Sequence, residues 1–170
     1  MTLSSAPDGG DEAIIGGPGW AIQRVGPWVL GHWNDSLDET RVIECRTLYR
    51  AARDAHGRFQ VLAVFRGYPF ALDLVFADRA RKLVLSLMDE IAPDVDALIF
   101  PIEGTGLKGA IMRSAAAGIV HQLRTRMPIS FPSSLEEGLT IARDKRLFTP
   151  AYPESVIRNR MVDLESRAHW

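Results

Sequence analysis

Two short runs that are almost entirely apolar constrain the fold of this chain most. They are residues 59–65 (Phe-Gln-Val-Leu-Ala-Val-Phe) and residues 96–100, which end in Ala-Leu-Ile-Phe. A strand that faces water on one side alternates apolar with polar residues, whereas a strand covered on both faces has no need to. We therefore expect both runs to be central strands of a sheet that carries helices on both faces.

Signals for strands and helices alternate along the rest of the chain. We expect an opening hairpin from residues 21–25 and 28–33, because Gly26-Pro27 separates the two runs, and a short closing strand at 129–131. Capping boxes begin two helices, at Ser36 and at Ser134, and Gly57 is placed to end the first. The four expected helices cover residues 36–56, 71–91, 105–126 and 134–143.

The resulting order of elements is β-β-α-β-α-β-α-β-α. Strands that alternate with helices are typical of parallel sheets with right-handed crossovers, and the hairpin adds an antiparallel strand. The sequence therefore predicts an α/β fold with a mixed, mostly parallel five-stranded sheet and four helices. A chain of 170 residues is long enough for one such domain.

The expected domain occupies residues 20–144, between two terminal segments. Residues 1–19 are rich in Ser, Gly, Pro and Asp and are expected to form a disordered acidic leader. Residues 145–170 are expected to form a tail with a short amphipathic helix, in which Ile157, Met161 and Leu164 make an apolar stripe. Such a stripe must be covered. Its own domain or a second copy would do so, and we favour a homodimer or partner contact through this tail and Trp170.

Composition excludes several classes of partner and compartment. The net charge of -1 gives no long-range field to attract nucleic acid, so no nucleic-acid partner is expected. No apolar run approaches the roughly 18 residues of a membrane span, so no membrane insertion is expected. Residues 1–19 contain no Lys or Arg, which a signal peptide requires. We therefore expect a cytoplasmic protein.

The residue types needed for catalysis are scattered. The four histidines share no spacing typical of metal ligands, and no Gly-x-Ser-x-Gly motif is present. The single cysteine, Cys45, lies on the apolar side of an expected helix, so we expect a buried thiol rather than a nucleophile. The sequence therefore predicts no enzyme, no metal and no cofactor.

One segment has the composition of a ligand-binding turn. Residues 103–109 (Glu-Gly-Thr-Gly-Leu-Lys-Gly) follow an expected strand and begin a helix, and a helix N-terminus suits anions. Ligands of α/β sheets bind at the carboxyl ends of the strands. The candidate ligand-binding residues are Arg66, Thr105, Gly106 and Lys108. The alternative is a plain strand-to-helix turn with Thr105 as its N-cap, since the spacing matches neither common phosphate-binding motif.

Residues 127–139 (Met-Pro-Ile-Ser-Phe-Pro-Ser-Ser-Leu-Glu-Glu-Gly-Leu) resemble the closing strand and last helix start of the STAS domain family. The anti-sigma-factor antagonists are its simplest members, and the chain is also similar to bacterial STAS-like proteins grouped with Sec14-type lipid-binding domains. The resemblance covers residues 20–143. It implies a bacterial, non-enzymatic protein–protein interaction module with a regulatory or scaffold role. The alternative function is binding of a small ligand (an anion, a nucleotide or a lipid).

The phosphorylation motif of the antagonists is missing from its expected place. Those proteins carry Asp-Ser-Ser-Gly-Leu after the third strand, where this chain has Gly-Tyr-Pro-Phe-Ala-Leu-Asp at residues 67–73, without Ser or Thr. The similar run at residues 103–107 follows the fourth strand, one βα unit later. We therefore expect no phosphorylation switch of the antagonist type.

Overall fold

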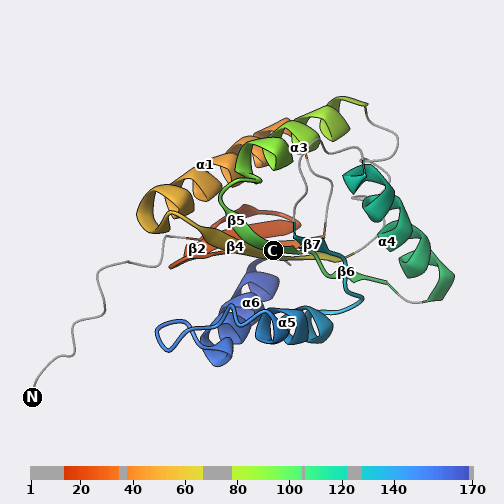
Figure 1. The fold of residues 1–170 in the computed structure, drawn as a ribbon. Helices are drawn as coiled ribbons and strands as arrows, with labels where there is room; N and C mark the ends of the chain where they lie inside the picture. The colour runs from red at the N-terminus through yellow and green to blue at the C-terminus, as the bar shows by residue number, and fades with distance from the viewer. Residues whose placement is uncertain (1–13, 35–37, 67–77, 105, 122–127, 169–170) are drawn as a thin grey trace, which may run out of the picture.

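The computed structural model describes residues 14–34, 38–66, 78–104, 106–121 and 128–168. This part of the chain forms one sheet of seven strands and five helices (Figure 1). In chain order the elements are β1 (Ile15–Gly17), β2 (Trp20–Val25), β3 (Trp28–Trp33), α1 (Glu39–His56), β4 (Phe59–Arg66), α3 (Asp78–Ile91), β5 (Val95–Ile99), β6 (Ile102–Glu103), α4 (Gly106–Val120), β7 (Ile129–Ser130), α5 (Leu135–Asp144) and α6 (Glu154–Ala168).

The sheet is mixed, as the sequence predicts. Its strand order is β1-β2-β3-β4-β5-β7, and β6 pairs with the end of β4. The first two pairings are antiparallel and the others are parallel. Because β4 lies between β3 and β5, and β5 lies between β4 and β7, the prediction of two central strands is confirmed.

Helices cover both faces of the sheet, which gives three layers. In Figure 1, α1 and α3 lie on one face with α4 at one end of that layer, and α5 and α6 lie on the other face. Consecutive residues of β4 alternate between the two apolar cores: Val61 and Ala63 belong to the α1/α3 core, whereas Leu62 and Val64 belong to the α5/α6 core. The double burial of β4 therefore explains its apolar sequence.

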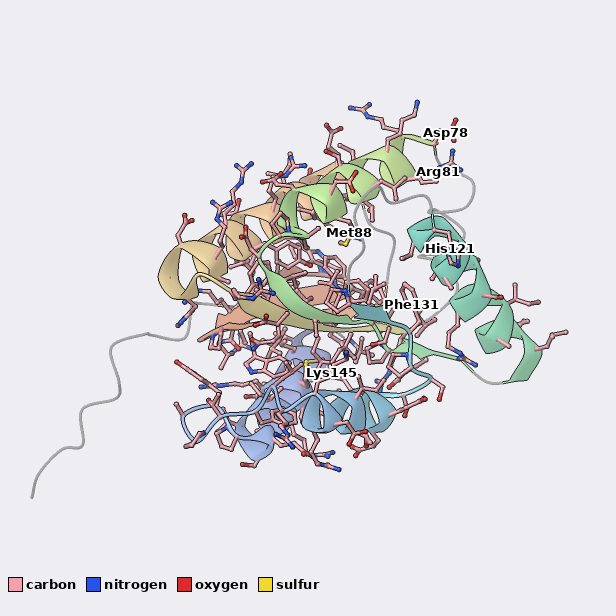
Figure 2. All side chains as sticks on the ribbon, in the orientation of Figure 1. Asp78, Arg81, Met88, His121, Phe131 and Lys145 are labelled. Carbon is pink, nitrogen blue, oxygen red and sulfur yellow. The ribbon has the colours of Figure 1, made fainter. Side chains whose placement is uncertain are left out.

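A row of aromatic side chains crosses the sheet beneath α1 and α3. It runs from β2 to the residue after β7 and consists of Trp20, Trp33, Phe65, Phe100 and Phe131. Successive ring centroids are 5.3, 6.2, 5.7 and 6.2 Å apart. Figure 2 shows Phe131 beside β7 and Met88 pointing from α3 toward the sheet. Such aromatic pairs contribute about 0.5–1.5 kcal/mol each beyond the area they bury, so the row ties the strands together.

The C-terminal tail docks on its own sheet. Its predicted stripe is fully covered within the chain, because Ile157 and Leu164 are 0% exposed and pack in the same core as Leu30 and Leu62. The backbone N–H of Gly19 donates to the carbonyl oxygen of Ala168 at 3.1 Å, which fixes the end of α6 beside the start of β2. The stripe therefore needs no second copy to cover it, and it gives no ground for a dimer through the tail.

The predicted counts of five strands and four helices are wrong, for three local reasons. β1 lies in the segment assigned to the leader, where Ile15 pairs with Ile22. The strand predicted at residues 96–100 is interrupted at Pro101, which lacks an N–H. The chain pairs with β4 again directly after it, as β6. The tail stretch is a helix of 15 residues rather than a short one.

Helix boundaries also differ from those predicted. The N-cap of α1 is Asp38, whose Oδ1 accepts from the backbone N–H of Arg41 at 2.9 Å; Ser36, the predicted cap, lies outside the described residues. Both residue types cap helices well and stand two positions apart, so the sequence did not distinguish them. Gly57 ends α1 with φ of 74°, as predicted. The predicted helices 71–91 and 105–126 are described as Asp78–Ile91 and Gly106–Val120.

The docking of α6 predicts a large difference between two neighbouring positions on this helix. Leu164→Ala removes a side chain that is 0% exposed, and we expect it to lower the free energy of unfolding by about 2–5 kcal/mol. The matched control is Val162→Ala on the outward side, where the side chain is 56% exposed and the loss should stay below about 0.5 kcal/mol. Urea unfolding of the full chain measures both. Equal losses would contradict the observed packing of α6.

Candidate functional site

A cluster of charged side chains surrounds the predicted site residue Arg66, at the carboxyl ends of β4 and β6. Arg66 ends β4, and its guanidinium Nε lies 2.5 Å from a carboxylate oxygen of Glu103, the last residue of β6. Its Nη1 donates to Glu165 of α6. The side chains of these three residues are between 23% and 37% exposed. Two carboxylates therefore neutralise the predicted anion-binding arginine.

Glu103 connects this cluster to the next helix. Its second carboxylate oxygen accepts from the backbone N–H of Leu135, the first residue of α5, at 3.4 Å. A negative charge near a helix N-terminus is favourable. Burial opposes the charge of Arg66, but hydrogen bonds to Glu103 and Glu165 outweigh this and raise the pKa of the guanidinium above its ordinary value. The cluster thus joins β4, β6, α5 and α6 as a structural tie.

The other predicted ligand residues lie at the start of α4. Thr105 is outside the described residues. Gly106 has φ of 62°, in the left-handed region that favours glycine, and both Gly106 and Lys108 are exposed. A Cβ on Gly109 would collide with the carbonyl oxygen of Gly104, so glycine is required where the chain turns into the helix. The turn is therefore sterically tight. This is compatible with both predictions, an anion-binding turn and a plain strand-to-helix turn.

The structure does not bring Arg66 and Lys108 to one site. Arg66 is paired with α6, on the α5/α6 side of the sheet, whereas Lys108 belongs to α4, whose buried residue Met112 packs in the core of the opposite side. The cation nearest to this turn in sequence, Arg113, donates from Nη1 to the carbonyl oxygen of Ile102 at 3.2 Å. Arg66 and Lys108 therefore share no hydrogen-bond or ion-pair partner among the described residues.

The outward face of α4 is a surface feature that sequence reasoning missed. Leu107 and Ile111 are 77% and 57% exposed, one turn apart, and are the largest side chains on this face. Its smaller members are Ala110, Ser114 and Gly118, all exposed. At 3.6 residues per turn these positions share one side of the helix, opposite the buried Met112 and Ala116. We call Leu107, Ala110, Ile111, Ser114 and Gly118 the α4 outer face.

This face differs from an ordinary exposed helix surface. A helix at the surface of a globular protein normally places charged residues toward water. The two charged residues of α4, Lys108 and Arg113, lie on the flanks of the outer face rather than along it. The sequence did not reveal this, because α4 has apolar residues on all sides and therefore shows no amphipathic period.

A small apolar cavity of about 50 Å³ lies between the sheet and the α1/α3 layer. Its wall includes Gly31, Ala63, Tyr49 and Cys45. Burial, followed by the nearby charge of Glu44, raises the pKa of the Cys45 thiol to about 12. A thiol with such a pKa stays protonated near neutral pH, and only the thiolate is a strong nucleophile. Cys45 is therefore an element of the core.

We expect Cys45 to be unreactive in the folded protein. Iodoacetamide at pH 8 should leave the native chain unmodified, because the thiol is both inaccessible and protonated. The same reagent in 6 M guanidinium chloride, a concentration above the roughly 5 M midpoint of hyperstable domains, should add one label per chain. Mass spectrometry of the intact chain measures both. Full labelling of the native protein would contradict the buried position.

The beginning of α5 gives a pH-dependent contribution to stability. Ser134 caps this helix, and the Glu137 carboxylate accepts from the Ser133 backbone N–H at 2.7 Å and from its hydroxyl at 2.8 Å. These two bonds, the backbone one first, lower the pKa of Glu137 below its ordinary value of 4.5. A lowered folded pKa stabilises the fold above the unfolded pKa, and this stabilisation is lost as the pH falls through the folded pKa.

Glu137→Gln should therefore be destabilising at pH 7 and progressively less so below pH 4.5. Because the site is exposed, the loss at pH 7 should remain below about 1 kcal/mol. Urea unfolding of both chains between pH 7 and pH 3 measures the difference. As a control, Glu137→Gln in a Ser133→Ala background should cost less at pH 7. A difference that grows toward acid would contradict the assignment.

The chemistry of these surfaces limits what the described part of the chain can do. No group of three or more His, Cys, Asp or Glu side chains within it is arranged to hold a metal ion. None of its helices combines the length and apolarity of a membrane span. The cluster at Arg66 pairs one cation with two carboxylates and so offers no free positive charge, whereas the uncharged α4 outer face is left open to an external contact. The chain matches no protein-family model, no curated protein and no solved structure.

Proposed function

We propose that this chain is a non-enzymatic protein–protein interaction module of the cytoplasm, with a regulatory or scaffold role like that of the STAS-domain proteins it resembles. The observation that carries the proposal is the α4 outer face. Exposed apolar residues scattered singly are normal, whereas a group of them on one helix face indicates a contact. Leu107 and Ile111 form such a pair on neighbouring turns.

The position of α4 makes this face available to a partner. In Figure 1 the helix stands at one end of the α1/α3 layer, next to β6. Its inner side is anchored, because Met112 and Ala116 are 7% and 6% exposed and belong to the core. A helix anchored in this way presents its outer face without first having to fold, which lowers the entropy cost of binding.

The alternative, a small-ligand site at the carboxyl ends of the strands, has weaker support. Arg66 is already paired with Glu103 and Glu165, so an anion would have to displace carboxylates. Binding of an anion at this edge would raise the melting temperature, whereas the interaction module predicts no such shift. Thermal unfolding with inorganic phosphate, a nucleotide or a lipid headgroup therefore separates the two functions.

The proposed contact is tested by photo-cross-linking from the surface itself. A benzophenone amino acid at position 107, in the full chain expressed in its native cell, should give discrete adducts with protein. The matched control is the same group at Ile43, which is 53% exposed on α1. Adding Ile111→Glu should reduce the adduct yield from position 107 at least tenfold, because an unpaired charge would be buried in the contact. Equal adducts from positions 107 and 43, or none from 107, would contradict the proposal.

A further inference from the structure

We propose that the partner on the α4 outer face is a second copy of this chain, whose own α4 packs against it in the antiparallel direction. The inference rests on the proposed function, because it names the partner of the same surface. Leu107, Ile111, Ser114 and Gly118 recur at intervals of four, three and four residues. This is the spacing of the apolar seam between two packed helices.

The sizes of these residues make the seam complementary to itself. The N-terminal half of the face carries the large Leu107 and Ile111, and the C-terminal half carries the small Ser114 and Gly118. A twofold axis between positions 112 and 113 places Leu107 opposite the partner's Gly118, and Ile111 opposite the partner's Ser114. Every layer then joins one large and one small side chain. Parallel packing would instead put Leu107 on Leu107 and leave a gap between two glycines.

No contact within the described part of the chain explains the glycine at position 118. Glycine inside a helix costs about 1 kcal/mol relative to alanine. A Cβ at Gly109 would lie 2.2 Å from the carbonyl oxygen of Gly104, and a Cβ at Gly138 would lie 3.0 Å from Pro101, so packing within the chain favours glycine at both positions. A Cβ at Gly118 would meet no atom within 4 Å in the described structure. Close approach of another helix accounts for a glycine at this exposed position.

Charge also favours a second copy. The outer face carries no formal charge, so two identical faces meet without the repulsion that like charges cause. Antiparallel packing brings Lys108 beside the C-terminal end of the partner's α4, where the helix dipole is negative. A strongly acidic or basic partner would find no complementary charge along this face. The α4 outer face is therefore complementary, in shape and in charge, to the same face of a second copy.

The expected dimer is weak. A helix of 15 residues is about 22 Å long, so two such helices bury less than the roughly 1,200 Å² of a standard interface. We therefore expect a dissociation constant in the micromolar range. Sedimentation equilibrium of the purified full chain should show the mass rising from 18.9 kDa toward twice that value as the concentration increases through this range.

Gly118→Leu is the decisive variant, because it fills the space for the partner's Leu107 at a position where an added Cβ meets no atom of the described chain. We expect the dissociation constant to rise at least tenfold and the melting temperature of the monomer to stay the same or rise, since leucine favours the helix over glycine. The matched control is Ala55→Leu, an exposed small residue of α1, which should leave the dissociation constant unchanged.

Disulfide cross-linking tests the direction and the register. A mixture of Ile111→Cys and Ser114→Cys chains should form a linked pair under mild oxidation, since these positions face each other. Leu107→Cys alone should not, because antiparallel packing separates the two copies of position 107 by eleven residues along the helix, about 16 Å, well beyond disulfide reach. The native Cys45 is buried and does not compete.

The outcomes separate this inference from the proposed function. A concentration-dependent dimer that Gly118→Leu weakens, with the 111–114 cross-link, supports the second copy. A chain that is monomeric throughout overturns it, as does a dimer that is insensitive to Gly118→Leu or that cross-links through position 107. If the chain is monomeric and position 107 still cross-links to another protein in the cell, the interaction module stands with a different partner. If the chain is monomeric and position 107 gives no adduct, both fail.

Discussion

Burial of β4 on both faces is the constraint on which the remaining architecture depends. Val61 and Ala63 point to one side and Leu62 and Val64 to the other, and each is less than 5% exposed. Each such side chain contributes roughly 25 cal/mol for every Å² of apolar surface removed from water, so both sides must be covered. The α1/α3 layer covers one side, and among the described helices α5 and α6, which follow β7, cover the other. The C-terminal helix is thereby part of the domain.

The core of this fold could be predicted because its signals are local. Apolar runs, Gly26-Pro27 and the Ser134 cap mark elements that the structure contains at nearly the same positions. The missed strands concern pairing across the chain. Ile15-Gly-Gly has little strand propensity and becomes β1 only because β2 offers an edge to it. The amphipathic stripe of α6 likewise indicates that this helix must be covered, but it does not indicate whether its own chain or another chain covers it.

The candidate site could be predicted less well, for a similar reason. Arg66 and Glu165 form an ion pair although they are 99 positions apart in the sequence. No local sequence pattern indicates that an arginine at the carboxyl edge of the sheet is already paired with carboxylates. On α4 the difficulty is the reverse. Apolar residues surround the whole helix, so only the structure tells the buried Met112 from the exposed Ile111. Solvent exposure, rather than residue type, distinguishes a core position from a contact surface here.

Trp20, Trp28 and Trp33 give each side of the sheet its own optical signal. Trp20 and Trp33 stack on the α1/α3 side at 5.3 Å, close enough for their indole transitions to couple, whereas Trp28 stacks on Phe148 in the core on the other side. Loosening of the α1/α3 layer would change the near-ultraviolet circular dichroism of the coupled pair. Detachment of α5 and α6 would expose Trp28 and shift its fluorescence to the red. The sheet thus carries two separate reporters, one for each side, without any added label.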